Sequence, residues 1–274
     1  MRGRSLARTA QAFLVAVVVV VGVAVFLGLR SYYTYQSGSA TTAPLITPTQ
    51  TSSTSATVSS TTTTSALSHL TLSEIESFSW LNETPSLGPS SSQKVIVILY
   101  DPECPYCAIE LNSTLPFLYY ISANTSQARV VFLGLPIHVF STQMLEILDA
   151  VYNMYGQRAF AELLDENYAY YYYMILQYEE GRTSQLVMPT NATLVSMADS
   201  LGYNVTQAEA TAYSSLVNST AYFLAQHGLT STPTVLAYDG QGGPVYVQVG
   251  LVNPYYIVCN LTEKLSLSVP GVSC

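Results

Sequence analysis

Two cysteines separated by two residues, Cys104 and Cys107 in the segment Cys-Pro-Tyr-Cys, have the spacing of a redox-active dithiol. An apolar run over 95–100 precedes them and a helix-like pattern over 108–122 follows, which predicts a strand, a tight turn and a helix that begins at the first cysteine. Unpaired amide N–H groups and a partial positive charge at a helix N-terminus favour a thiolate. Pro105 suits the first helical position, where a missing N–H costs nothing. Cys104 is therefore predicted to be the nucleophile and Cys107 to resolve its mixed disulfide.

The same spacing also occurs in zinc sites and in structural disulfides, and both remain alternatives. Structural zinc needs four ligands, but the chain has no second Cys-x-x-Cys, and its three histidines, His69, His138 and His227, are scattered. A disulfide in so short a ring would constrain little of the unfolded chain. We therefore expect a redox pair that uses neither a metal nor a cofactor.

Composition restricts the classes of partner that the chain can bind. Of its 274 residues, only 9% are charged. Beyond Arg30 there are five basic and seventeen acidic residues, a net charge of −12. Because nucleic-acid binding needs clustered cations that displace counterions, we expect no nucleic-acid partner.

The first part of the chain has the pattern of a membrane anchor followed by a linker. Residues 10–30 contain an almost uninterrupted apolar run of about twenty residues, the length that crosses a bilayer. Three arginines precede this run and one follows, which predicts a cytoplasmic N-terminus over 1–9 and an extracytoplasmic remainder. A cleaved signal peptide is the alternative, but no small-x-small cleavage site follows the run. Segment 31–70 is rich in Ser and Thr and predicts a disordered stalk.

Glycosylation motifs support the same compartment independently. Seven Asn-x-Ser/Thr sequons occur in a chain with only ten asparagines, which favours an exported glycoprotein. The candidate acceptors are Asn82, Asn112, Asn124, Asn191, Asn204, Asn218 and Asn260.

Segment 71–274 is predicted to be one folded domain. Strands are expected over 94–100 and 128–135, and the helix between them completes a right-handed parallel βαβ unit, with a proline inside this helix at Pro116. The carboxyl ends of the two strands then open on one edge, so the turn that contains His138 should lie beside the cysteines. A helical capping box, at Thr71 with Glu74 or at Ser73 with Glu76, is expected to open the domain.

The rest of the domain divides into helices and a hairpin. Apolar periodicity over 141–227 predicts a helical insertion without strands. Strands over 234–238 and 245–249 flank a Gly-rich turn, which predicts a hairpin, and a final helix covers 253–267. Thr232-Pro233 precedes the hairpin, and a proline that enters a strand often marks a cis peptide bond.

This ordered set of motifs resembles the thioredoxin superfamily, in particular its DsbA-like branch of extracytoplasmic thiol-disulfide oxidoreductases. The likeness covers about 72–267 and rests on Asp-Pro-Glu-Cys-Pro-Tyr-Cys over 101–107, on Ser-Thr-Pro-Thr over 231–234, and on the helical insertion between them. It implies an α/β thioredoxin fold, a central mixed sheet flanked by helices, with an inserted helical domain. It also implies that Cys104 is the nucleophile and Cys107 its partner.

The resemblance implies further residues of the active-site loop and one departure. Pro105 and Tyr106 would form the dipeptide between the cysteines, and Thr232-Pro233 would face them and present backbone to an extended substrate. Many relatives carry a buried carboxylate six residues before the first cysteine, but this chain has Ile98 there.

Without that carboxylate, proton transfer at the second cysteine must use water or another group. Glu103 and His138 are the candidates for this proton transfer. A solvated acid and an ordinary loop histidine are the simpler interpretations of these two residues.

Two further cysteines, Cys259 and Cys274, remain outside the motif. Four cysteines permit three pairings, and if Cys104 and Cys107 pair, the second bond joins the last helix to the C-terminal residue. We expect a structural disulfide there.

The predicted function is a monomeric, membrane-anchored enzyme that introduces disulfides into exported proteins and is recycled by a membrane redox partner. The dipeptide leaves the redox direction open, because reduction potentials span roughly 150 mV across such proteins. Two alternatives are a reductase or isomerase fed with electrons across the membrane, and a non-catalytic surface glycoprotein that uses the same fold to bind a partner.

Overall fold

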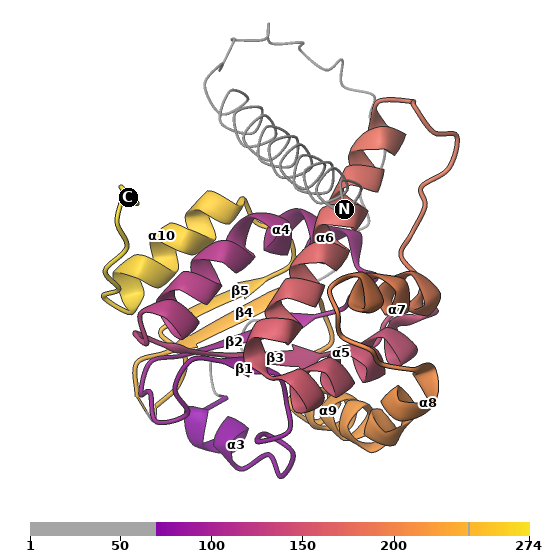
Figure 1. The fold of residues 1–274 in the computed structure, drawn as a ribbon. Coiled ribbons are helices and arrows are strands. Elements are labelled where there is room, and N and C mark those ends of the chain that lie inside the picture. Colours follow the sequence, from indigo (N-terminus) through magenta and orange to yellow (C-terminus); the bar gives the residue numbers. More distant parts are fainter. Residues whose placement is uncertain (1–69, 241) are drawn as a thin grey trace, which may run out of the picture. The chain divides into compact units, whose positions relative to one another are not determined.

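The computed structural model describes residues 70–240 and 242–274 (Figure 1). The predicted cytoplasmic segment 1–9 and anchor 10–30 lie outside the described residues, as does the predicted linker 31–70 except for Leu70, which is buried. In the described part of the chain, no helix is both long and apolar enough to cross a membrane. The anchor and the stalk therefore stay predictions from the sequence.

The domain is built on one five-stranded mixed sheet with the order β1-β3-β2-β4-β5. Its central pair, β2 and β3, is parallel, and the other three pairs are antiparallel. The predicted βαβ unit and the predicted hairpin are both present. The strands are β1 Ser86–Leu87, β2 Val95–Tyr100, β3 Arg129–Gly134, β4 Thr234–Tyr238 and β5 Tyr246–Val249.

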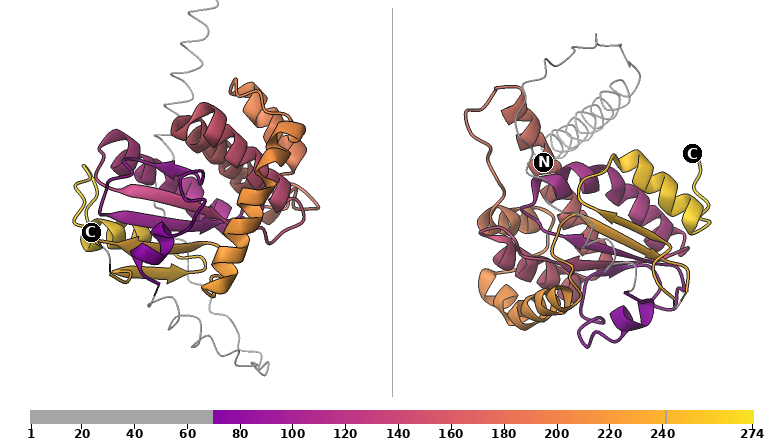
Figure 2. Two further views of the ribbon diagram at one scale, coloured as in Figure 1. Left: turned by 90° about the horizontal axis from the view of Figure 1, so that it is seen from below. Right: turned by 180° about the vertical axis from the view of Figure 1, so that it is seen from behind.

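Helices cover both faces of this sheet, which is why all six residues of β2 are buried (Figures 1 and 2). Alternate side chains point to opposite faces of a strand. Those of Ile96 and Ile98 belong to the core shared with α4 (Pro105–Tyr119) and α10 (Pro254–Lys264). The side chains of Val95, Val97 and Leu99 pack on the other face with α3 (Leu72–Glu76) and α9 (Ser214–Gln226). The apolar run before the cysteines is thus a strand with no solvent-exposed side.

The helix after the cysteines differs from the single helix predicted up to residue 122. Helix α4 passes through Pro116 and ends at Tyr119, and a π-helical turn, η1, continues over Tyr120–Asn124. A proline inside a helix removes one backbone donor, so the regular hydrogen-bond ladder is interrupted near it. The first part of α4 remains regular, and this is the part that carries the cysteines.

The segment between β3 and β4 is helical, as predicted. Figure 2 shows these inserted helices to one side of the sheet. The long α6 packs against both α4 and α5. The elements of the insertion are α5 Ser141–Tyr155, α6 Gln157–Glu179, α7 Asn191–Ser200, α8 Gln207–Ala210, η2 Thr211–Tyr213 and α9.

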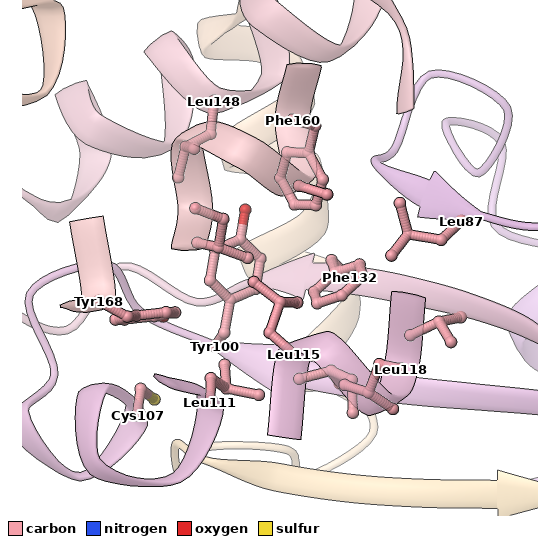
Figure 3. Close-up of a cluster of buried hydrophobic side chains, with 14 of the residues drawn as sticks. Leu87, Tyr100, Cys107, Leu111, Leu115, Leu118, Phe132, Leu148, Phe160 and Tyr168 are labelled. Atoms are coloured by element: carbon pink, nitrogen blue, oxygen red, sulfur yellow. The ribbon is translucent and has the colours of Figure 1, made fainter. Parts of the chain in front are cut away.

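A buried aromatic cluster joins the insertion to the sheet (Figure 3). Phe132 of β3 and Phe160 of α6 meet edge to face with ring centroids 5.1 Å apart, and Tyr100 of β2 lies 5.9 Å from Phe132. Edge-to-face pairs add stabilisation beyond the area that they bury. Cys107 belongs to the same cluster and is fully buried. The position of the second cysteine is therefore fixed by the core itself.

The disulfide at the C-terminus joins α10 to the end of the chain. Cys259 and Cys274 are bonded, with Cα atoms 5.4 Å apart and a sequence separation of 15 residues. Segment 265–274 follows α10 without further helix or strand. The bond therefore fastens an otherwise irregular tail to the last helix.

Replacing Cys274 by serine is expected to lower the free energy of unfolding of the oxidised protein by about 3 kcal/mol, because the unfolded chain regains the entropy of a loop of this length. Denaturant unfolding of the full chain with and without a reductant measures the effect. Cys274→Ser and Cys259→Ser should be equally destabilised. Equal stability of wild type and variants under oxidising conditions would contradict a structural role for this bond.

Candidate active site

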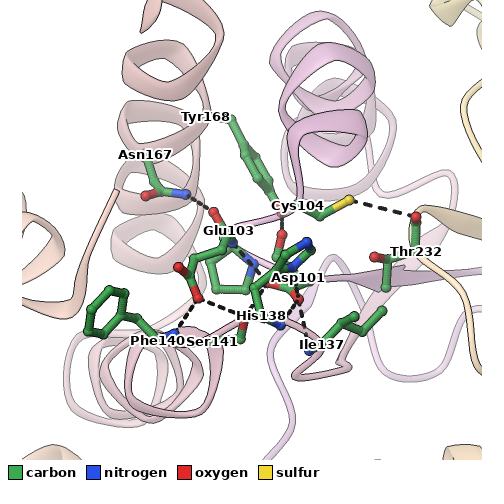
Figure 4. Close-up of polar contacts among 11 residues, drawn as sticks. Asp101, Glu103, Cys104, Ile137, His138, Phe140, Ser141, Asn167, Tyr168 and Thr232 are labelled. Carbon is green, nitrogen blue, oxygen red and sulfur yellow. Dashed lines mark hydrogen bonds and ion pairs between the residues drawn. The ribbon is translucent and has the colours of Figure 1, made fainter. Parts of the chain in front are cut away.

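The two free cysteines lie at the start of α4, directly after the buried strand β2. Figure 4 shows Cys104 in this turn. Cys104 is the N-cap residue, with extended backbone (φ −75°, ψ 119°), and Pro105 occupies the first helical position. No side chain caps the amide groups of the first turn, so these amides remain available to the Cys104 sulfur. Cys104 is 3% exposed and Cys107 is 0% exposed, whereas Tyr106 between them is 56% exposed. Only the first sulfur lies near the surface.

The two thiols lie one helical turn apart, but the pKa of Cys104 is lowered and the pKa of Cys107 is raised. Hydrogen bonds from the side chains of Cys107 and Thr232 and from the backbone amides of Tyr106 and Cys107 lower the pKa of Cys104 to about 6, against the opposing effect of burial. Burial raises the pKa of Cys107 well above its usual range, and the neighbouring Cys104 raises it further. The geometry therefore separates a thiolate that can attack from a thiol that holds its proton.

A second segment forms the other wall of the site. The Thr232-Pro233 peptide bond is cis, and the Cys104 thiol lies 3.7 Å from the Thr232 carbonyl oxygen, which accepts from it. Pro233 has no amide hydrogen, and its carbonyl accepts from Gly250 N at 2.8 Å. The predicted loop therefore faces the predicted nucleophile.

The buried carboxylate of Asp101 joins the turn before Cys104 to the loop after β3. Its Oδ1 accepts from Glu103 N at 2.8 Å and from Ser141 Oγ at 2.6 Å. Its Oδ2 accepts from the backbone N–H of Ile137 at 2.9 Å and of His138 at 3.3 Å, and lies 2.8 Å from His138 Nδ1. The loop after β3 thus lies beside the cysteine turn, as the βαβ unit predicted.

Helix α6 supports the same turn from its other side. Tyr168 Oη donates to the Asp101 carbonyl at 3.1 Å, and Asn167 Nδ2 donates to the Pro102 carbonyl at 3.0 Å. Both side chains are fully buried. The sequence analysis included Asp101 only as part of the motif 101–107 and did not single out Asn167 or Tyr168, because their partners lie too far along the chain for a local pattern to show.

The two predicted proton-transfer candidates have their hydrogen-bond partners in Asp101 and in residues 140 and 141. Glu103 is fully buried, which corrects the expectation of a solvated acid, and it accepts from Phe140 N and from Ser141 Oγ. The imidazole of His138 pairs with Asp101. Neither side chain forms a hydrogen bond with Cys104 or Cys107 in the described residues. Their proposed role in proton transfer stays a prediction.

A buried acid that the sequence analysis did not single out lies on α4, the helix that carries the dithiol. Glu110, three residues after Cys107, is fully buried, and its Oε2 accepts from Gln248 Nε2 at 3.1 Å and from Val252 N at 3.3 Å. Burial raises its pKa to about 7. The signal in the sequence was an acid at the i+3 position of the second cysteine, within an otherwise apolar stretch of helix.

The remaining predicted residues are distributed over the surface. None of the seven sequon asparagines is buried: four are exposed, at positions 82, 124, 204 and 218, and three are partly exposed. In the described residues, no three His, Cys, Asp or Glu side chains gather in a way that could hold a metal ion.

Comparison with known proteins identifies the fold. No family model and no curated protein sequence matches the chain. Among solved structures, the catalytic domain of ScsC from Proteus mirabilis is 18% identical, with a TM-score of 0.52 over 74% of this chain and 98% of that one. A periplasmic thioredoxin-like protein from Salmonella enterica serovar Typhimurium is 16% identical, with a TM-score of 0.52 over 72% and 98%.

A third similar structure is the thiol-disulfide exchange protein alpha-DsbA2 from Wolbachia pipientis, which is 13% identical, with a TM-score of 0.50 over 70% of this chain and 94% of that one. At such identities the likeness concerns the fold. It confirms the predicted thioredoxin fold, a mixed sheet flanked by helices with a helical insertion.

The alkylation rate of Cys104 is expected to rise with pH through about 6, because only the thiolate attacks and its pKa is lowered to that value. Iodoacetamide labelling of the reduced chain from pH 4 to 9, read by mass spectrometry at each cysteine, measures this titration. Cys107 should remain unlabelled around neutral pH, and Cys104→Ser should remove the low-pH phase. A midpoint near the ordinary thiol pKa would contradict the proposed activation.

Proposed function

Since this chain has the fold of the DsbA-like thiol-disulfide exchange proteins, we propose that it is a protein thiol-disulfide oxidoreductase with Cys104 as nucleophile and Cys107 as resolving thiol. The observation that carries the proposal is the contrast between the two thiols of one helical turn. Cys104 has a lowered pKa and borders the cis-proline loop, whereas Cys107 is buried and has a raised pKa. A cysteine pair with only a structural role does not require two thiols of different acidity.

The exchange proceeds through a mixed disulfide. A substrate thiolate attacks Cys104 Sγ of the oxidised pair, the Cys104–Cys107 bond breaks, and Cys107 leaves and takes up a proton. A second substrate thiolate then attacks the substrate sulfur of the mixed disulfide, and Cys104 leaves as a thiolate. The substrate loses two electrons and gains a disulfide, and the enzyme becomes a dithiol. Because the thiolate of Cys104 is stabilised, Cys104 is the better leaving group of the two cysteines.

The surface around Cys104 suits an extended, apolar substrate segment. Thr232 presents its backbone beside the nucleophile, and an extended chain can pair with exposed backbone as an added strand. Tyr106, Ile137 and Val139 are 56%, 50% and 79% exposed, and all three lie in the cysteine turn or in the loop fastened to it by Asp101. These uncharged side chains favour the unfolded segments of proteins that still need their disulfides.

We propose the oxidising direction, with exported proteins as substrates. Ionisation of Cys104 stabilises the dithiol form: with a pKa of about 6, the thiolate at pH 7 favours that form by about tenfold, or about 30 mV for a two-electron couple. The sequons and the apolar segment 10–30 support an extracytoplasmic, oxidising compartment. In this proposal the domain is tethered outside the membrane, and a membrane redox partner reoxidises the dithiol.

Cys107→Ser is expected to accumulate covalent adducts with substrate proteins, because Cys104 can still attack a substrate disulfide, and without Cys107 the mixed disulfide cannot be converted to the Cys104–Cys107 disulfide. Non-reducing electrophoresis after expression of the full chain in its host, with and without reductant, detects the adducts. Cys104→Ser is the matched control and should trap none. Equal absence of adducts in both variants would contradict the mechanism and favour a non-catalytic protein.

The reduction potential should lie nearer to about −120 mV, as in strongly oxidising enzymes, than to about −270 mV, as in a reducing thioredoxin. Equilibration of the purified full chain with glutathione buffers, followed by alkylation and mass spectrometry, measures the potential. A value near the thioredoxin end would instead support a reductase fed with electrons across the membrane.

A further inference from the structure

Glu110 lies nearly one helical turn after Cys107 on α4. The two residues are three positions apart, and Cβ atoms at this spacing are about 5–6 Å apart. Helical side chains lean toward the N-terminus of their helix. The carboxyl group of Glu110 therefore extends from its Cα back toward the turn that carries the buried thiol.

One of the two carboxyl oxygens of Glu110 has no hydrogen-bond partner among the described residues. Oε2 accepts from Gln248 and Val252, but Oε1 is buried and has no hydrogen-bond partner among the described residues. None of the described lysines and arginines forms an ion pair with this acid. A buried polar atom without a partner costs stability, and such atoms in native proteins call for an explanation.

The same contacts connect Glu110 to the other wall of the active site. Gln248 Nε2 also donates to the Gly250 carbonyl, and Gly250 N donates to the Pro233 carbonyl at 2.8 Å. Glu110 therefore belongs to a chain of hydrogen bonds that runs from the helix of the cysteines to the cis-proline loop. Its location is a part of the active site and not a remote region of the core.

The chemistry of exchange requires a proton donor and acceptor at this position. Cys107 must lose its proton when it attacks and gain one when it leaves, yet it is fully buried. Glu103 accepts hydrogen bonds from Phe140 and Ser141, and Nδ1 of His138 pairs with Asp101. Ile98, the strand residue that faces the same side of the sheet, is apolar.

We propose that Glu110 is the residue that exchanges the proton of Cys107, directly or through one water molecule, an inference that rests on the proposed function. When Cys107 attacks the mixed disulfide, the Glu110 carboxylate takes the thiol proton. The new Cys104–Cys107 bond forms, and the substrate leaves as a thiolate. In the reverse step, the neutral Glu110 acid gives its proton to the departing Cys107 sulfur. No other oxidant or reductant is needed.

The acidity of Glu110 suits this task. Burial raises its pKa to about 7, and the hydrogen bonds from Val252 and Gln248 oppose the shift. A group with a pKa near the working pH can serve as both acid and base. The titratable groups that interact with Glu110 electrostatically are Cys104 on its own helix and Tyr246 on β5, and the contacts from β5 and the loop after it come from uncharged groups.

Glu110→Gln tests this proposal, because glutamine keeps the shape and one carbonyl acceptor but cannot take up a proton. The full-length dithiol is converted to the Cys104–glutathione mixed disulfide, and the release of glutathione by Cys107 is followed from pH 5 to 9. In the wild type, the rate should rise with pH through about 7 as the Glu110 carboxylate forms. In Glu110→Gln this inflection should disappear, and the rate at pH 7.5 should fall at least about tenfold.

A matched control is Asp149→Asn on α5. Asp149 is also a buried acid whose pKa is raised by burial, but it interacts with neither cysteine, so its replacement should leave the pH profile unchanged. An unchanged rate and inflection in Glu110→Gln would overturn the inference. That outcome would leave the proposed function intact, because the mixed disulfide would still form and resolve. Failure of the wild type to form any adduct at Cys104 would instead overturn the proposed function.

A second measurement does not depend on the folding of the variant. Infrared difference spectra between the dithiol and disulfide forms of the wild type should show a protonated carboxyl band that changes with redox state near pH 7. The absence of any redox-sensitive carboxyl band between pH 5 and 9 would also overturn the inference.

Discussion

The carboxylate of Asp101 is the interaction on which the arrangement of the site depends. It accepts five hydrogen bonds, from the cysteine turn, from the loop after β3 and from the first residue of α5. Hydrogen bonds to an ionised acceptor are about twice as strong as those between neutral groups. The buried charge is therefore compensated by donors from three segments. Each of these segments is in turn fixed relative to the start of α4.

This arrangement leaves the N-terminus of α4 free for chemistry. A Ser, Thr or Asp at an N-cap would satisfy the first amides by itself. Here the N-cap residue is Cys104, and Asp101 bonds to Glu103 N upstream of the helix, so the amides of Tyr106 and Cys107 act on sulfur. The cost of burying Cys104 opposes its ionisation, yet the hydrogen bonds outweigh that cost, and the pKa falls to about 6. At Cys107, burial and the neighbouring Cys104 outweigh the hydrogen bonds that oppose them, and the pKa is raised.

The sequence predicted those features that depend on local patterns. The strand, turn and helix around the two cysteines follow from an apolar run, a Pro at the first helical position and helical periodicity. The hairpin after Pro233 follows from turn chemistry. Because a parallel pair joined by a helix has one handedness, even the proximity of His138 to the cysteines could be predicted.

Features that depend on long-range polar contacts could not be predicted. Glu103 was predicted to be a solvated acid, because the local sequence does not indicate its hydrogen bonds with the distant residues Phe140 and Ser141. Tyr168 looked like one aromatic among many, although its hydroxyl holds the Asp101 carbonyl. The π-helical turn after Tyr119 likewise depends on how the end of α4 meets the core, which periodicity does not encode.

The location of Glu110, the buried acid on α4, is related to three residues that are neighbours across the sheet. Ile98, Val235 and Gln248 are paired in register on β2, β4 and β5, so their side chains share the face that α4 covers. An acid at position 98 would lie at the centre of this face, between Phe132 on β3 and Val235, with apolar neighbours only. Glu110 instead approaches from the helix and meets the row at its polar end, Gln248 on the edge strand β5.

An edge location changes what a buried acid can do. At the centre of the sheet, a carboxyl group can exchange protons only through the space between helix and strands. Beside β5, Glu110 contacts the loop that begins at Gly250, which also borders Pro233, so the substrate-facing loop and the acid share one hydrogen-bonded chain. In our proposal, Glu110 exchanges the proton of Cys107 at this edge of the sheet, whereas Ile98 at its centre only packs in the core.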